Sequence, residues 1–169
     1  MASILNVDKI RATGSTTDGL TIDSTGRVLQ PNGVFAYVNL TASNAQDGSH
    51  PYESTGVDIR FDKVNVNRGS AYTESNGRFT APVAGIYRLF ISLLKTNTST
   101  ATYWTVFKNG SNALFSGYNS NSGYCPVVGE AFFDLAANDY LTVRLQDGGI
   151  NLTGATANAY NNVTFELVG

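Results

Sequence analysis

Residues 85–94 read GIYRLFISLL, and this stretch decides the fold. Successive side chains of a β-strand point to opposite faces. One face would carry Tyr87, Leu89, Ile91 and Leu93, and the other would carry Ile86, Phe90 and Leu94. A strand that is apolar on both faces is covered on both, and the outer face of a two-layer sandwich normally meets solvent. We therefore expect an oligomer and assign Tyr87, Leu89, Ile91 and Leu93 to its interface, although the sequence alone allows either face.

The same alternation of apolar and polar residues recurs on both sides of this stretch. Strands are predicted at 34–40, 57–61, 103–108, 127–135, 140–145 and 163–168. The pair Asn109-Gly110 directly after one of them is a strong hairpin signal. No segment has the period of an amphipathic helix. Many short strands between glycine-rich turns predict an all-β sandwich or jelly roll.

Residues 1–33 differ from the rest, because their few apolar side chains are separated by small polar ones. In the segment 19–28 apolar and polar residues alternate, a turn follows at 23–26, and the alternation resumes, which predicts a short hairpin or a β-spiral element. An isolated hairpin is marginal in water, so three copies would have to wrap together or dock on a partner. A disordered leader is the alternative. The side chains expected to make this attachment are Ile4, Leu5, Val7, Ile10, Leu20 and Ile22.

Composition bounds the remaining possibilities. A chain of 169 residues can bury a full core in one domain. Its net charge of -2, with no block of either sign, disfavours nucleic acid and lipid as partners.

Cys125 is the single cysteine, so no internal disulfide forms and we expect it to be buried as a small apolar residue. Neither a signal peptide nor a run of roughly 20 apolar residues is present. We expect synthesis in a cytosol, no export by the usual signal and no membrane insertion.

The segment from Val57 to Leu94 resembles the globular head of complement component 1q, in the tumour-necrosis-factor-like superfamily. The resemblance is carried by Phe61, Asn67, Tyr72, Phe79, Gly85 and Tyr87. It continues through 107–110, 134–141 and 163–167, although Leu89 and Ile91 stand where the family usually has aromatic residues. The resemblance covers residues 34–169. It implies a homotrimeric jelly roll of about ten antiparallel strands.

The first 33 residues carry a second resemblance. Residues 5–10 read LNVDKI and residues 20–28 read LTIDSTGRV, with Pro31 shortly after. These two segments are similar to the starts of structural proteins of marine and cyanobacterial phages, where such arms precede this head domain. The resemblance implies a place on the surface of a virion, with the arm binding other phage structural proteins.

Catalytic and metal-binding patterns are scarce. His50 is the single histidine and falls in a loop-like stretch, so neither a Ser-His-Asp catalytic triad nor a zinc site has the groups it needs. No glycine-rich phosphate loop is present. Asp147, followed by Gly148-Gly149, lies where some relatives hold calcium, and a plain tight turn is the favoured alternative. We predict a protein that is not an enzyme and has no cofactor.

Tyrosines are the candidate binding residues. Tyr103 and Trp104 point to opposite faces of one strand, so at least one of them belongs to the core or an interface. The segment 116–125 holds Tyr118 and Tyr124 among Ser, Asn and Gly, a composition found in adaptable binding loops. A solvated crossover loop is the alternative for this segment.

These observations favour a trimeric fibre tip or tail adhesin of a phage, which binds a host glycan or protein. A capsid decoration protein is the first alternative, and a free secreted ligand-binding module is the second. In each case residues 34–169 form the head and residues 1–33 form the arm.

Overall fold

The structure is a computed structural model that describes residues 7–11, 13–16, 19–30, 33–41, 56–95, 101–147 and 160–169. The chain divides into two compact units, Met1–Gly33 and Val34–Gly169. We call the first unit the arm and the second the head.

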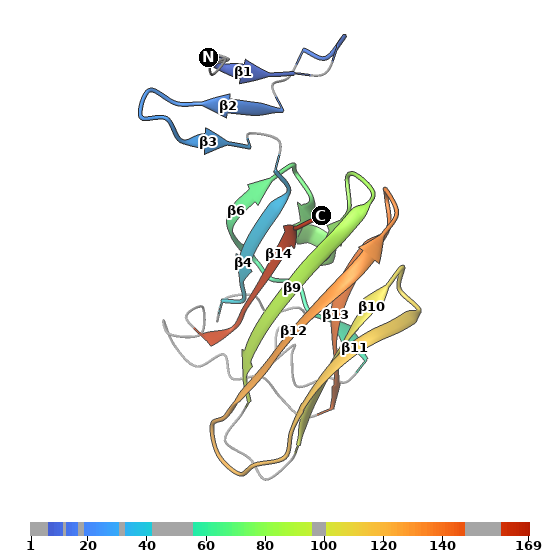
Figure 1. Ribbon diagram of the computed structural model, residues 1–169. Coiled ribbons are helices and arrows are strands. Elements are labelled where there is room, and N and C mark those ends of the chain that lie inside the picture. The colour runs from blue at the N-terminus through green and yellow to red at the C-terminus, as the bar shows by residue number, and fades with distance from the viewer. Residues whose placement is uncertain are drawn as a thin grey trace. The chain divides into compact units, whose positions relative to one another are not determined.

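The arm contains a small antiparallel sheet (Figure 1). Its strands, in spatial order, are β1 (Lys9–Ile10), β2 (Leu20–Ile22) and β3 (Val28–Leu29). Thr21 pairs with Leu29 and Ile22 pairs with Val28, which confirms the hairpin predicted at 19–28. Ile10, Val28 and Leu29 remain exposed, so within one chain this sheet has no core of its own among its described residues.

The head is a sandwich of two antiparallel sheets, and the all-β jelly-roll prediction is confirmed (Figure 1). The β9 sheet contains, in spatial order, β12 (Pro126–Leu135), β9 (Gly85–Leu94), β14 (Asn162–Leu167), β4 (Phe35–Asn39) and β6 (Lys63–Arg68). The β10 sheet contains β11 (Asn112–Asn119), β10 (Thr102–Lys108), β13 (Tyr140–Asp147), β8 (Arg78–Thr80) and β7 (Tyr72–Thr73), and β5 (Val57–Asp58) pairs with β13. A short 3-10 helix, η1 (Glu74–Asn76), links β7 to β8.

The core lies between the two sheets and is built around aromatic rings. Phe79 stacks on Phe165 with ring centroids 4.5 Å apart, and the edge of Tyr87 meets Phe79 at 5.5 Å. Offset and edge-to-face contacts of this kind are the favoured geometries for aromatic pairs. Phe79, Phe165 and Tyr87 come from β8, β14 and β9, so this cluster ties both sheets together.

Residues that carry the family resemblance also form hydrogen bonds beyond the pairing of the strands. The Tyr72 hydroxyl accepts a hydrogen bond from the Phe61 amide at 3.0 Å and donates one to the Phe61 carbonyl at 3.1 Å. The Asn67 side chain pairs with both backbone groups of Tyr72, at 2.9 and 3.0 Å. Buried backbone groups need such partners, so Phe61, Asn67 and Tyr72 act as one structural unit.

Trp104 fills the space between the sheets near β11 and β12. Its indole lies where side chains at Gly117 and Gly129 would stand, and its Nε1 donates to the Val127 carbonyl at 3.3 Å. Phe115 meets the indole edge-on at 5.6 Å. Tyr103, the preceding residue, is only partly buried and points to the opposite face. The prediction that Tyr103 and Trp104 lie on opposite faces is therefore confirmed.

The interface assignment made from the sequence is wrong in its choice of face. Tyr87, Leu89, Ile91 and Leu93 are fully buried within a single head, where they face the other sheet. A side chain without exposed surface in one chain has none to offer to a second. Any subunit contact of β9 must use the alternate residues, which include Ile86, Phe90 and Leu94.

Candidate binding surfaces

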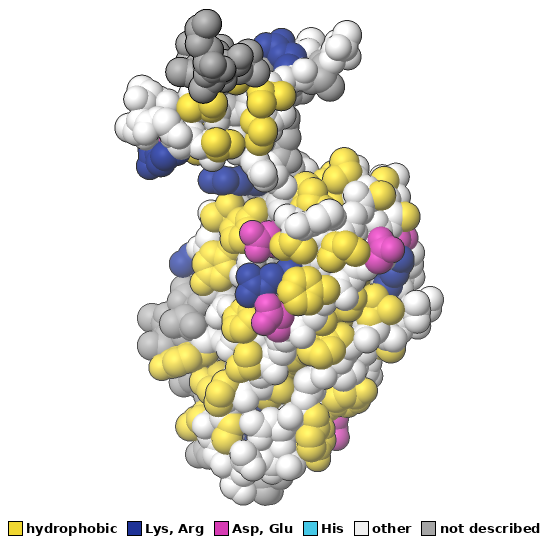
Figure 2. Space-filling view, in the orientation of Figure 1, with side chains coloured by type: hydrophobic (Ala, Val, Ile, Leu, Met, Phe, Trp, Pro, Cys, Tyr) yellow, Lys and Arg dark blue, Asp and Glu magenta, His cyan; other side chains and the backbone are white. Residues whose placement is uncertain are grey.

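The outward face of the β9 sheet is covered by side chains that alternate with the core residues (Figure 2). Strand register places Phe132, Arg88, Glu166 and Phe35 in one row across four strands. The next row contains Glu130, Phe90, Thr164 and Tyr37. We call this surface the β9 face. It joins aromatic and charged side chains that lie far apart in the sequence.

The β9 face exposes large apolar side chains. Phe132 has 60% of its surface exposed, and Val128 and Ile86 on the same face are exposed as well. Phe35, Tyr37, Phe90 and Leu94 are half-buried. Single exposed apolar residues are normal, whereas a contiguous group that continues across neighbouring strands marks an interaction surface.

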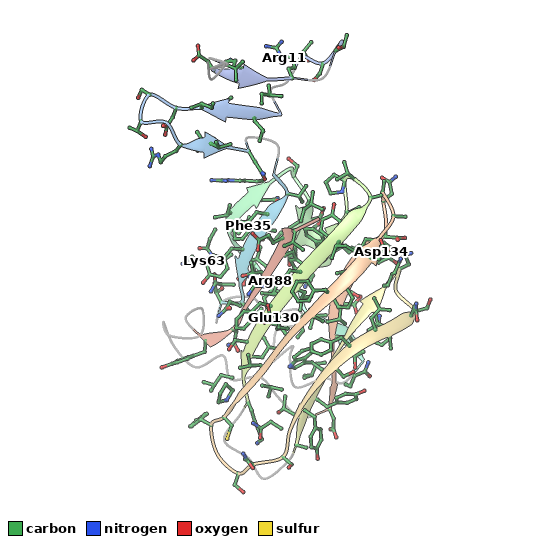
Figure 3. All side chains as sticks on the ribbon, in the orientation of Figure 1. Arg11, Phe35, Lys63, Arg88, Glu130 and Asp134 are labelled. Atoms are coloured by element: carbon green, nitrogen blue, oxygen red, sulfur yellow. The ribbon has the colours of Figure 1, made fainter. Side chains whose placement is uncertain are left out.

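A charged cluster lies within this apolar surface. Arg88 Nε lies 2.5 Å from Glu130 Oε1 (Figure 3). Arg88 Nη1 lies 3.5 Å from Glu166 Oε2. The hydrogen bond to Glu130 raises the pKa of the Arg88 guanidinium above its ordinary value, with a smaller contribution from Glu166. The Arg88 guanidinium therefore pairs with two carboxylates, and the three side chains together carry a net charge of about -1 at neutral pH.

A second surface lies on the outward side of the β10 sheet. Tyr118 is 67% exposed and pairs across the strands with Tyr103. Tyr118 belongs to β11, so the prediction of a loop from 116 to 125 is wrong for its first residues. Tyr124 does lie in the turn between β11 and β12, where it is 57% exposed. The two tyrosines were predicted to share one loop, and the structure assigns them to a strand and a turn.

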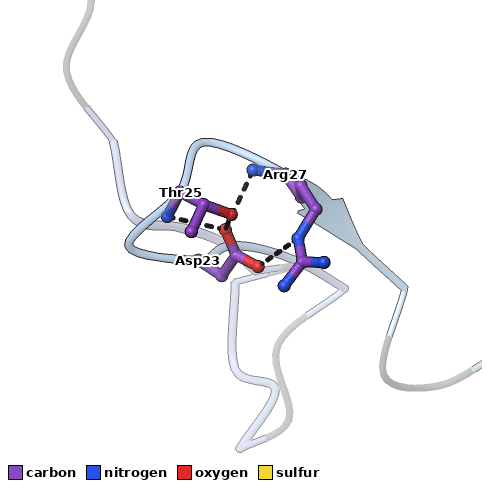
Figure 4. Close-up of polar contacts among 3 residues, drawn as sticks. All are labelled: Asp23, Thr25 and Arg27. Carbon is purple, nitrogen blue, oxygen red and sulfur yellow. Dashed lines mark hydrogen bonds and ion pairs between the residues drawn. The ribbon is translucent and has the colours of Figure 1, made fainter.

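The arm hairpin is closed by a network of polar contacts around one carboxylate (Figure 4). The Asp23 carboxylate accepts hydrogen bonds from the Thr25 amide (2.9 Å), the Thr25 hydroxyl (2.6 Å) and the Arg27 amide (3.0 Å), and it pairs with Arg27 Nε at 2.7 Å. These bonds, above all that of the Thr25 hydroxyl, lower the pKa of Asp23 to about 2. The turn that aligns β2 with β3 is thus held by its own side chains.

The predicted attachment residues of the arm are only partly described. Ile10 and Ile22 are exposed and Val7 and Leu20 are half-buried, whereas Ile4 and Leu5 lie outside the described residues. Their role in attachment stays a prediction.

The remaining candidates are a cation site, a histidine and a cysteine. Asp147 ends β13 and is exposed, and within the described ranges no group of three His, Cys, Asp or Glu is placed to hold a metal. His50 lies outside the described residues. Cys125 is only half-buried, next to the turn before β12, so the expectation of full burial is wrong.

In the described part of the chain, no helix has the length and hydropathy to cross a bilayer.

A model of the C1q domain family matches residues 41–166. The chain belongs to the C1q domain family. Similar curated proteins include collagen alpha-1(X) chain of Mus musculus, 28% identical over 104 residues, which are 61% of this chain and 15% of that protein. Complement C1q tumor necrosis factor-related protein 3 of Mus musculus is 30% identical over 95 residues, which are 55% of this chain and 38% of that protein. The chain thus spans well under half the length of these relatives.

Solved structures with the same fold include the globular domain of zebrafish complement 1qA protein. It has a TM-score of 0.59 at 15% identity and covers 81% of this chain and 98% of that one. Eiger TNF from S. frugiperda has a TM-score of 0.62 at 11% identity, with coverage of 82% and 94%. Murine APRIL at pH 5.0 has a TM-score of 0.58 at 14% identity, with coverage of 80% and 99%. These similarities confirm the jelly roll of the C1q head.

Sequence reasoning missed the contribution of β12 to the surface of the C1q head. Val127, Phe133 and Leu135 alternate with Val128, Glu130 and Phe132, so the segment is apolar on both faces just as β9 is. The same period-two test applied to residues 126–135 would have found the exposed set. The pairing of Arg88 with Glu130 needed strand register, which the sequence does not supply.

Proposed function

We propose that this C1q head is a non-enzymatic binding module that assembles as a homotrimer through its β9 face. We further propose that the trimer is a fibre tip or tail adhesin on the surface of a phage particle, with the arm attached to other virion proteins and the head binding the host surface.

The exposed apolar surface of the β9 face carries the proposal of self-association. Phe132, Val128 and Ile86 are exposed while the alternate residues on the same strands are in the core. A second and third copy would remove these side chains from water, and each buried Å² of apolar surface contributes about 25 cal/mol. A homotrimer is also consistent with the family, because its fold is shared with tumour-necrosis-factor-like heads.

The proposal of binding follows from what three heads on one axis can do. Linked sites that engage together bind far more tightly than one site alone, because each further contact forms at high effective concentration. A trimer of such heads can in this way attach firmly through weak single contacts. This is the mechanism that we propose for host attachment.

The phage assignment rests on the arm, since the curated relatives named above are animal proteins. The small sheet of the arm exposes Ile10, Val28 and Leu29, so its described residues form no core within one chain. Such a sheet gains stability by trimeric wrapping or by docking on a partner. Its segments LNVDKI and LTIDSTGRV resemble phage structural proteins, which favours a virion protein as that partner.

The native mass of the full-length chain, measured by light scattering, tests the trimer. We expect the mass of three chains for the wild type and of one chain for Phe132→Glu, because a charge on the β9 face would be buried without a partner. Tyr118→Glu is the matched control, since Tyr118 is equally exposed on the other sheet and should leave the trimer intact. A monomeric wild type, or a trimeric Phe132→Glu variant, would contradict the proposal.

Deletion of residues 1–33 tests the arm. We expect soluble trimers that no longer join the particle, because the head retains its own core while the attachment sheet is gone. Incorporation is measured by the presence of the head in purified virions. Unimpaired incorporation of the shortened chain would show that the arm is not the attachment element.

A further inference from the structure

We propose that Tyr118, Tyr103 and Asp147 form a binding site for a neutral saccharide on the outward face of the β10 sheet. This inference rests on the proposed function, in which the head meets a host surface. It adds the chemical class of the ligand and the residues that would hold it.

Strand register places the three side chains in one row. Tyr103 on β10 pairs in regular register with Tyr118 on β11 at one side, and across a shift in register next to Trp104 it pairs with Asp147 on β13 at the other. Side chains directly opposite on neighbouring strands have Cβ atoms about 5 Å apart. The two aromatic rings are therefore neighbours on one surface, and the exposed Asp147 lies beside Tyr103 at the end of β13.

Core packing fixes the direction in which this row points. Trp104 follows Tyr103 and Gly117 precedes Tyr118, and both are buried against each other between the sheets. Because side chains alternate along a strand, Tyr103 and Tyr118 must point outward. A change of rotamer could not return either ring to the core, since the indole of Trp104 already fills it. The aromatic surface is thus preformed.

A short chain of hydroxyl groups supports the row. Thr105 Oγ1 lies 2.9 Å from Ser116 Oγ, and Ser116 Oγ lies 3.4 Å from the Tyr103 hydroxyl. Bonds from Ser116 and Thr105 lower the pKa of Tyr103, so its phenol is a better proton donor than a free tyrosine. With the Tyr103 oxygen held from one side, its proton remains able to bind an incoming oxygen.

The charges around the row favour a neutral ligand. Arg144, on the neighbouring strand, pairs with Asp58 at 2.7 Å and lies 4.4 Å from the centre of the Phe107 ring. An anionic sugar would approach the Asp147 carboxylate without gaining this guanidinium, which already has two partners. A neutral sugar avoids that repulsion, and its hydroxyls can donate to Asp147.

Saccharides match this combination of groups. One face of a pyranose ring is rich in C–H groups and packs on an aromatic ring, while its hydroxyls need donors and acceptors at the edge. Tyrosine supplies apolar area with a polar tip, and small hydroxyl side chains add hydrogen bonds. The site lies on the sheet opposite to the β9 face, so it stays open in the proposed trimer. Three shallow sites per trimer would act together.

Binding to an array of purified bacterial polysaccharides, neutral and acidic, tests the inference. Affinity for the bound polysaccharide is then measured by titration with wild type, Tyr118→Ala and Tyr103→Phe. We expect binding to neutral polysaccharides, a loss of about tenfold or more for Tyr118→Ala and a smaller loss for Tyr103→Phe, which keeps the ring. Tyr124→Ala is the matched control, since Tyr124 is similarly exposed but lies outside the row; it should bind within about twofold of wild type.

Asp147→Asn gives a second readout that a purely structural role would not move. It keeps the shape of the side chain and removes its charge, so binding of acidic polysaccharides should rise relative to neutral ones. All variants must melt at the wild-type temperature and keep the trimeric mass. A wild type that binds no polysaccharide, binds only acidic ones, or binds equally well after Tyr118→Ala would overturn the inference.

The outcomes also separate this inference from the proposed adhesin. If virions adsorb to cells equally well with wild-type and Tyr118→Ala heads, the adhesin stands and the saccharide site is wrong. If the head binds neutral polysaccharides through Tyr118 but is absent from virions, the site stands and the virion assignment is wrong.

Discussion

At the scale of single residues, Gly117 beside Trp104 leaves less room for a side chain than any other described glycine. A methyl group at Gly117 would lie 2.3 Å from Trp104 Cζ2, well inside van der Waals contact. We predict that Gly117→Ala lowers the free energy of unfolding by about 1–3 kcal/mol, the usual effect of overpacking a core. Denaturant titration measures this difference.

The control for this prediction comes from the same strand. Leu114 on β11 is exposed, so Leu114→Ala should change the free energy of unfolding by no more than about 0.5 kcal/mol. Equal effects of the two substitutions would mean that the indole can move aside when a side chain is added at position 117.

Asp139 gives the head a dependence on pH. Its carboxylate pairs with Lys108 Nζ at 2.6 Å and accepts hydrogen bonds from the Asn109 side chain and the Ala136 amide. These contacts, with Lys108 the largest, lower its pKa from 3.8 to about 2. The stabilisation is therefore fully present above about pH 4 and is lost as the pH falls through 2.

We predict that Asp139→Asn lowers the melting temperature at pH 7 and that the difference from wild type shrinks between pH 4 and 2. Protonation removes from the wild type the same charge that the substitution removes. Thermal unfolding followed by circular dichroism across this range measures the effect. A difference that stays constant down to pH 2 would mean that the charge of Asp139 contributes nothing.

At the scale of elements, β9 shows what a period-two pattern can and cannot predict. The alternation of residues 85–94 correctly separated two sets of side chains, of which one is buried in the core and the other is exposed or half-buried. The large apolar residues alone could not say which set faces the second sheet, because both sets contain them. Ser92 and Arg88 belong to the outer set and mark it as the exposed one, since polar and charged side chains are rarely placed in a core.

The loop predicted at 116–125 failed for a related reason. Ser116, Gly117 and Asn119 are poor strand formers, so composition favoured a loop. Gly117 is in the strand because Trp104 needs the space of a missing side chain, and the hydroxyl of Ser116 bonds with Thr105 across the strands. Tertiary packing overrode local preference, and the sequence alone contains no sign of that packing.

The charged cluster of the β9 face leads to a prediction about assembly. If trimer formation buries this face, Arg88→Met leaves Glu130 and Glu166 together without their cation. Breaking a buried ion pair costs about 3–5 kcal/mol, so the variant should be mostly monomeric. Sedimentation equilibrium measures the association constant.

Replacement of the whole cluster is the informative companion to that variant. In Arg88→Met combined with Glu130→Leu and Glu166→Leu, no charge remains to be desolvated, and buried charge clusters replaced by apolar residues often gain stability. We expect this triple variant to associate at least as tightly as wild type. Weak association of the triple variant, with a native fold, would show that the cluster itself forms bonds between subunits.

At the scale of the whole molecule, assembly and stability should be linked. A native state that binds further copies of itself is stabilised by mass action, so the melting temperature of a trimer rises with protein concentration. We predict such a rise for the wild type and none for monomeric Phe132→Glu. Differential scanning calorimetry over a hundredfold range of protein concentration measures this rise.

The division into arm and head could be drawn from the sequence because the density of apolar residues changes near residue 33. The function of each part was less accessible, since attachment and recognition depend on partners that the chain does not encode. The row of Tyr118, Tyr103 and Asp147 required the register of three strands that are distant in sequence.

The position of Trp104 gives the head an internal optical probe. It is the single tryptophan of the chain, and its indole is fully buried between the two sheets beside Phe115. Emission excited selectively at the indole therefore arises from one known place, where β10, β11 and β12 meet. A shift of that emission to longer wavelength would report water entering between the layers, and the opening of the sandwich could be timed without attaching any label.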